Sequence, residues 1–225
     1  MYKNVYFVLK FVCGEHFFQK SKKLLFKGVN MKTFMGEDFV LKNKTAQILY
    51  HDYAKDMPIF DFHCHLSVEE IYNDKKFSSI TEAWLGGDHY KWRLLREMGV
   101  DESYITGDKG DYEKFLEYAK VMPYAIGNPI FHWTHLELRR YFDEILSPNT
   151  AESTYNRANE KLQTLTARKL ITMSNVKKLF TTDDPIDDLH FHKLLKEDKS
   201  FAVEVEPAFR PDKALNIEQS TYVSY

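Results

Sequence analysis

The chain has 225 residues, with 31 Lys or Arg and 33 Asp or Glu, which gives a formal net charge of −2 at pH 7. This near-neutral balance gives no reason to expect a nucleic-acid partner, and the length allows one large domain or two small ones. The two cysteines, Cys13 and Cys64, provide no disulfide framework, which favours a reducing compartment such as the cytoplasm.

The first 30 residues read as an extension outside the main fold, which would then begin at Met31. An apolar run over residues 5–9 is interrupted by Lys10, so it is too short for a transmembrane helix. The uninterrupted apolar region and the cleavage site of a signal peptide are also missing. We therefore expect no membrane partner.

Two histidines follow the first predicted strand. Residues 43–55 favour a short amphipathic helix that ends before Pro58, and an apolar strand then runs through Phe62. Because strand side chains alternate with period two, His63 and His65 point to one face and Cys64 to the other. Paired imidazoles can bind one divalent metal, whereas Cys64 reads as a small buried hydrophobe. The alternative is two unrelated histidines near a surface turn.

A long helical insertion, over about residues 67–175, is expected after this strand. Ser67 and Asp88 are suitable N-caps for its first helices. Further helical patterns follow over residues 111–121, 129–142 and 150–165.

The chain then returns to strands, predicted over residues 176–182 and 201–205, with a helix over 186–196 between them. Strand, helix and strand in this order imply parallel strands with helices packed outside. Polar residues follow each strand, as in a (β/α)₈ barrel. A doubly wound sheet is the runner-up, but no Gly-x-Gly-x-x-Gly follows any strand. Three strands where a barrel needs eight predict an incomplete barrel, the front part of a larger enzyme.

The segment from Asp61 to Leu66, which contains His63-Cys64-His65, resembles the metal-binding start of the amidohydrolase superfamily. Further matches in order along the chain, from about Phe34 onward, narrow the resemblance to the uronate (glucuronate) isomerase family. They are Gly36-Glu37-Asp38-Phe39, Asp88-His89-Tyr90, Tyr104-Ile105-Thr106-Gly107, Gly127-Asn128-Pro129, Thr181-Thr182-Asp183-Asp184-Pro185 and Phe209-Arg210-Pro211-Asp212-Lys213.

Members of this family look like distorted (β/α)₈ barrels that interconvert D-glucuronate with D-fructuronate and D-galacturonate with D-tagaturonate. The resemblance implies that His63 and His65 bind a divalent metal, usually zinc. It makes His89 and Tyr90 catalytic residues of the substrate pocket, and Arg210 the residue that binds the sugar acid. These residue types suit the chemistry, because the isomerisation needs a polarising group and a general acid/base, and a guanidinium suits a carboxylate.

Structural alternatives remain open at each of these positions. His89 could be a surface histidine at a helix start, and Tyr90 could pack on Trp92 or Trp84. Arg210 could form a surface ion pair with Asp212. Asp183 and Asp184 could serve as helix caps. We assign no catalytic role to the histidines of the helical segments, which are His132, His135, His190 and His192.

The chain departs from the family pattern in its missing later strands. In the family these supply a further pocket histidine and an Asp-x-Arg segment whose aspartate completes the metal site. We therefore expect this chain alone to bind metal weakly and not to turn over substrate. A metal-dependent hydrolase on the same barrel, or an inactive fragment with an interaction role, is the alternative. A homo-oligomer is compatible with the full-length enzyme.

Overall fold

The computed structural model describes residues 34–220 and Tyr222. Backbone contacts divide these residues into two units. A helical unit contains residues 34–43 and 77–164, and a sheet unit contains residues 44–76 and the described residues from Leu165 onward. The predicted extension over residues 1–30, together with Cys13, lies outside the described residues.

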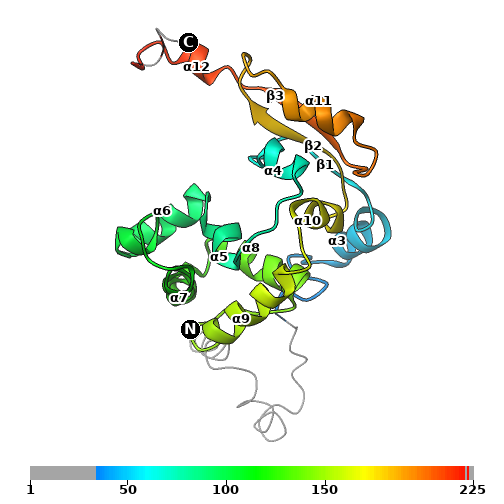
Figure 1. The fold of residues 1–225 in the computed structure, drawn as a ribbon. Coiled ribbons are helices and arrows are strands. Elements are labelled where there is room, and N and C mark those ends of the chain that lie inside the picture. Colours follow the sequence, from blue (N-terminus) through cyan, green and yellow to red (C-terminus); the bar gives the residue numbers. More distant parts are fainter. Residues whose placement is uncertain (1–33, 221, 223–225) are drawn as a thin grey trace, which may run out of the picture. The chain divides into compact units, whose positions relative to one another are not determined.

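Three parallel strands form the sheet (Figure 1). They are β1 (Ile59–Asp61), β2 (Val176–Asp183) and β3 (Glu204–Phe209), in the spatial order β1-β2-β3. The register pairs Asp61 with Leu179 and Leu179 with Val205. The α/β class with a parallel sheet is therefore confirmed.

Short helices cover one face of this sheet. They are α4 (Val68–Tyr72), α10 (Ala167–Met173) and α11 (His190–Glu197), and Ser67 caps α4 as predicted. One apolar cluster joins helices and sheet; its buried members are Ile71, Ile171, Leu179, Leu195 and Val205. Burying each such side chain contributes roughly 1.5–3 kcal/mol to the free energy of folding. Since strand side chains alternate, even-numbered residues of β2 lie on the opposite face.

Two further helical segments of the sheet unit bury none of their residues. The predicted helix over 43–55 is present as α3 (Lys44–Ile48), which continues into a π-helical turn, η1 (Leu49–Ala54). Its apolar side chains are exposed, with Tyr53 at 70%. The amphipathic packing that the pattern indicated is therefore not formed within the sheet unit. A short α12 (Asp212–Leu215) follows β3.

The helical unit confirms the helices that the sequence predicted between residues 88 and 165. Its elements are α5 (Ile80–Leu85), α6 (His89–Glu97), η2 (Glu102–Tyr104), α7 (Asp111–Val121), η3 (Met122–Ala125), α8 (Pro129–Glu137), η4 (Leu138–Phe142) and α9 (Ala151–Leu162). None of the helices in the described part of the chain is long and apolar enough to cross a membrane.

Aromatic side chains form the centre of the helical unit. Phe115 and Tyr118 of α7 are fully buried, and the Trp84 ring of α5 stacks on Phe115 with centroids 6.3 Å apart. The buried Tyr118 hydroxyl lies 2.6 Å from the Thr134 hydroxyl of α8. The only polar atom of the Tyr118 side chain therefore has a partner, as burial requires.

Strand β3 and helix α11 differ from the sequence prediction by more than one residue. Strand β3 spans Glu204–Phe209 rather than 201–205, and it includes Pro207 opposite Thr181 of β2. Proline is tolerated there because β3 pairs only with β2 in the described sheet. Helix α11 begins at His190 rather than at 186, because Leu189 adopts a left-handed φ of 55°.

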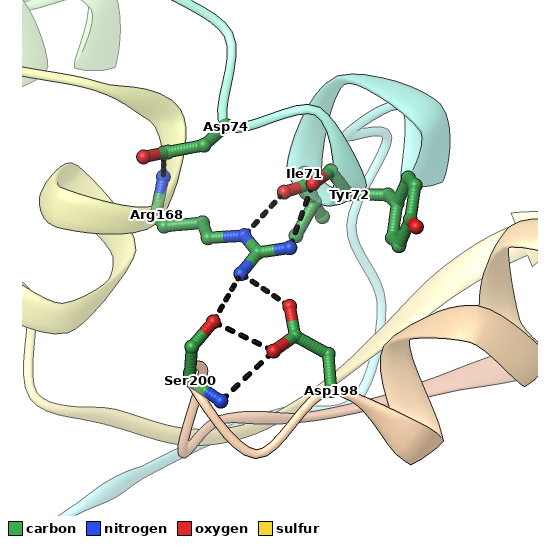
Figure 2. Close-up of polar contacts among 6 residues, drawn as sticks. All are labelled: Ile71, Tyr72, Asp74, Arg168, Asp198 and Ser200. Atoms are coloured by element: carbon green, nitrogen blue, oxygen red, sulfur yellow. Dashed lines mark hydrogen bonds and ion pairs between the residues drawn. The ribbon is translucent and has the colours of Figure 1, made fainter.

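The Arg168 guanidinium ties together three segments of the sheet unit (Figure 2). Its Nε donates to the carbonyl of Ile71 at 2.8 Å and its Nη2 to that of Tyr72 at 2.7 Å, so it satisfies carbonyls at the end of α4. Its Nη1 pairs with Asp198 at 2.6 Å, in the loop before β3. One side chain of α10 therefore joins the end of α4 to the loop between α11 and β3.

Asp198 is held ionised by its neighbours. Hydrogen bonds from the Ser200 hydroxyl and backbone N–H, followed by the bond from Arg168, lower the pKa of Asp198 to about 2. The carboxylate is thus negatively charged throughout the neutral range and remains a partner for the guanidinium.

Arg168→Met is expected to lower the free energy of unfolding by roughly 2–3 kcal/mol, because two helix-end carbonyls lose a charged donor. Urea denaturation followed by circular dichroism measures the change. Arg96→Met is the matched control, since the Arg96–Glu102 pair is about half exposed and solvent screens such surface pairs. Equal midpoints for the two variants would contradict the role assigned to Arg168.

Candidate functional site

The predicted histidine pair lies immediately after β1. Residues His63 and His65 are outside the regular strand, but the Cys64 N–H donates to the carbonyl of Phe180 at 2.9 Å and so continues the pairing with β2. The two exposed imidazoles meet nearly at right angles, with their Nε2 atoms 3.2 Å apart. Both rings therefore lie on the same side of the segment, as the sequence predicted.

The nitrogen spacing fits two coordination positions of one metal ion. A tetrahedral zinc ion with Zn–N bonds of about 2.0–2.1 Å places its ligand nitrogens roughly 3.3–3.4 Å apart. The observed separation of 3.2 Å between the Nε2 atoms of His63 and His65 is close to this value. Within the described residues, no group of three or more His, Cys, Asp or Glu side chains forms a metal cluster. The pair therefore fits part of a metal site.

Cys64 lies on the other side of the segment and packs against the cluster that contains Ile71 and Leu179. It is half-buried, and this burial raises the pKa of its thiol. A thiol that stays protonated at neutral pH is a poor metal ligand. Cys64 thus packs as a small hydrophobe, although it is less buried than the sequence suggested.

Thr182 of β2 contacts the histidine pair, and sequence reasoning missed it. The Thr182 hydroxyl lies 3.3 Å from Nδ1 of His65 and donates to the carbonyl of Cys64 at 3.4 Å. The preceding residue, Thr181, is buried on the helix-covered face, and its hydroxyl lies 2.7 Å from Nε2 of His192. Strand alternation predicts that the two threonines lie on opposite faces of the sheet, but it does not predict which residues they contact.

Asp183 and Asp184 are not both caps. The Asp183 carboxylate accepts a hydrogen bond from the Thr181 hydroxyl at 2.7 Å, and it lies 3.6 Å from Nε2 of the buried His192. Asp184 accepts from the Ile186 N–H at 3.2 Å in the turn after β2. Asp183 therefore forms a polar cluster with the buried side chains of Thr181 and His192, whereas Asp184 stabilises the turn after β2.

Arg210 follows β3 at the same edge of the sheet. Its N–H donates to the carbonyl of Asp183 at 3.0 Å, which continues the β2–β3 pairing. The Nε atom donates to Asp212 at 2.7 Å, and the side chain is 46% exposed. The ion pair that the sequence allowed is thus present, and it uses one edge of the guanidinium.

His89 and Tyr90 begin helix α6 of the helical unit, whereas the other predicted site residues belong to the sheet unit. Both side chains are exposed, with Tyr90 at 69%. The ring that packs on Trp92 is that of His89, at 4.6 Å between centroids. That His89 and Tyr90 share a pocket with the histidine pair stays a prediction.

Asp88 fixes the start of α6. Its Oδ1 accepts from the N–H groups of Tyr90 and Lys91, each at 3.0 Å, and its Oδ2 accepts from the buried Lys91 ammonium at 2.7 Å. Burial raises the pKa of Asp88, but the hydrogen bonds from Lys91 and Tyr90 lower it by more than burial raises it. The pKa of Asp88 therefore lies below its ordinary value. The predicted cap is confirmed, and it is ionised.

These features define an α/β protein that carries two imidazoles after β1 and a guanidinium after β3, the strands on either side of β2 in the described parallel sheet. The family model for glucuronate isomerase matches residues 31–225. The chain therefore belongs to the glucuronate isomerase family.

Individual relatives and solved structures agree with this assignment. The uronate isomerase of Caldicellulosiruptor saccharolyticus is 60% identical over 197 residues, which cover 87% of this chain and 42% of that protein. The uronate isomerase of Bacillus subtilis is 56% identical, over 85% of this chain and 41% of that protein. The crystal structure of uronate isomerase from Thermotoga maritima has a TM-score of 0.82 at 39% identity, over 86% of this chain and 43% of that one. The chain thus spans about two fifths of the length of these relatives.

Asp88→Ala is expected to destabilise the first turn of α6 by about 1 kcal/mol, because two backbone N–H groups lose their cap. Asp88→Asn keeps an oxygen acceptor for these groups and removes only the charge that faces Lys91. Amide hydrogen exchange of residues 89–92 should therefore accelerate several-fold in the alanine variant and less in the asparagine variant. Unchanged exchange in Asp88→Ala would contradict the capping role.

Proposed function

We propose that this chain forms the metal- and carboxylate-binding part of a uronate isomerase, which interconverts D-glucuronate with D-fructuronate and D-galacturonate with D-tagaturonate. The observation that carries the proposal is the position of His63 and His65 after β1 and of Arg210 after β3, at one edge of the parallel sheet. In parallel sheets, whether open or closed into a barrel, ligands bind at the carboxyl-terminal ends of the strands. The proposed architecture is the first part of a distorted (β/α)₈ barrel.

Arg210 is proposed to bind the carboxylate of the sugar acid. Asp212 occupies Nε, and a guanidinium carries further donors on its two Nη atoms. A substrate carboxylate can therefore pair with the Nη side while Asp212 holds the side chain in place. The planar donor geometry gives orientation as well as attraction, which an ammonium group would not provide.

His63 and His65 are proposed to hold a divalent cation, zinc being the first candidate. When bound, such a cation polarises a hydroxyl or carbonyl oxygen of the sugar. His89 and Tyr90 are proposed as the groups that move a proton between adjacent carbons, a step that needs an acid/base within hydrogen-bond reach.

The described residues bring together only two metal-binding side chains, whereas zinc sites use roughly three or four protein ligands. We therefore propose that this chain by itself binds metal weakly and does not turn over uronate. A cytoplasmic location, with Cys64 as a free thiol, and assembly into a homo-oligomer are further parts of the proposal.

Cobalt(II), whose visible absorption reports histidine coordination, tests the histidine pair in the 225-residue chain. His63→Ala and His65→Ala are each expected to weaken cobalt affinity at least tenfold, since either change leaves a single imidazole at the site. His190→Ala is the control, because His190 is an exposed histidine of the same unit and should leave affinity unchanged. Binding that survives loss of both His63 and His65 would refute the metal site.

Saturation-transfer NMR with D-glucuronate tests Arg210. Arg210→Met is expected to abolish the transfer signal and Arg210→Lys to weaken it, because lysine keeps the charge but not the planar fork. Arg140→Met, at an exposed arginine of the helical unit, should bind like the unchanged chain. Equal signals for Arg210→Met and Arg140→Met would refute the carboxylate site.

A further inference from the structure

We propose that Thr182 is a positioning residue that sets the tautomer of His65 and thereby directs its Nε2 lone pair toward His63. The inference rests on two contacts of this side chain, one with the carbonyl of Cys64 and one with Nδ1 of His65. It also rests on the metal-binding role of the histidine pair proposed above, since the tautomer has a function only if Nε2 is a ligand atom.

The Thr182 hydroxyl lies within hydrogen-bond distance of two groups. This group has one hydrogen to donate and can also accept. It donates to the carbonyl of Cys64 at 3.4 Å, and a carbonyl oxygen can only accept. The remaining contact, at 3.3 Å to Nδ1 of His65, is then satisfied only if the ring nitrogen donates. Both contacts together assign the Nδ1–H tautomer to His65.

The second step follows from the imidazole ring. In a neutral histidine with a proton on Nδ1, the lone pair lies on Nε2. The Nε2 atom of His65 is the atom that lies 3.2 Å from Nε2 of His63. The hydroxyl on β2 thus prepares the nitrogen that faces the shared coordination position. Metal-binding histidines generally donate their second N–H to a fixed acceptor, and here the acceptor is Thr182.

The third step is that Thr182 comes from another strand. Its partner Cys64 is also tied to β2 through the bond from its own N–H to the carbonyl of Phe180, at 2.9 Å. The loop that carries both histidines is therefore held against β2 at two consecutive points. Rotation of the His65 ring would break the Nδ1 contact without any change in the backbone bond.

Thr181 provides a matched control on the opposite face of the same strand. It is also a threonine with a histidine partner, but its hydroxyl lies 2.7 Å from Nε2 of His192 and contacts neither His63 nor His65. Valine keeps the branched shape that suits a strand at either position. Thr181→Val therefore reports any general effect of removing a hydroxyl from β2.

Nitrogen NMR of the ¹⁵N-histidine-labelled 225-residue chain, without metal, tests the tautomer directly. His65 is assigned from the resonances that disappear in His65→Gln. We expect a protonated Nδ1 and an unprotonated Nε2 in the unchanged chain, a mixture of tautomers in Thr182→Val, and a return to one tautomer in Thr182→Ser. Thr181→Val should leave His65 unchanged. An Nε2–H tautomer in the unchanged chain, or no difference in Thr182→Val, overturns the inference.

Zinc affinity, measured by competition with a chelating dye, separates this inference from the proposed function. Thr182→Val is expected to lose roughly tenfold in affinity, with rescue by Thr182→Ser, while circular dichroism stays unchanged. If the unchanged chain binds no zinc, the proposed metal site fails, but the tautomer result still stands or falls by the NMR spectra. If the unchanged chain and Thr182→Val bind zinc equally, Thr182 has no positioning role.

Discussion

The sheet unit depends on the contacts of Arg168, which join three segments near the amino-terminal ends of the strands. The guanidinium holds the last carbonyls of α4 on one side and Asp198, before β3, on the other, and its Cζ atom lies 5.0 Å from the centre of the Phe201 ring. Helix α4 starts at the cap Ser67, two residues after His65. Because α4 is short, fixing its last residues also restricts the position of its first residues and of the histidine segment before them. The stabilising contacts of Arg168 and the proposed ligand site thus lie at opposite ends of the strands, as is usual in parallel α/β folds.

Local chemistry explains which parts of this fold could be predicted from the sequence. The caps Ser67 and Asp88 and the apolar strand around Leu179 are recognisable because each depends on neighbours along the chain. The boundaries of β3 and α11 were wrong because they depend on other contacts. Pro207 is accepted in a strand only at an edge, and Leu189 must take a left-handed conformation before α11 can begin. Neither condition is visible in apolar periodicity.

In the candidate site, too, contacts between near neighbours in the chain could be predicted, whereas contacts between strands could not. The meeting of His63 and His65 follows from alternation over three residues, and the pair of Arg210 with Asp212 follows from their closeness in the chain. Thr182 could not be found by such reasoning, because its contact with His65 joins residues 117 positions apart. Only the parallel register of β1 and β2 brings the two segments together. Thr182 belongs to a motif that the sequence analysis recognised, but its contact with His65 becomes visible only in the folded sheet.

Burial separates His135 and His192 from the histidine pair after β1. His135 of α8 is 3% exposed among Phe34 and Phe131, and this burial lowers its pKa to about 4, so it stays neutral at physiological pH. His192 is likewise buried against Thr181. Both rings are nearly inaccessible to solvent. The pair after β1 differs in both respects, because its rings are exposed and its Nε2 atoms converge. Their exposure and their convergence after a strand therefore make these two histidines the candidates for metal binding.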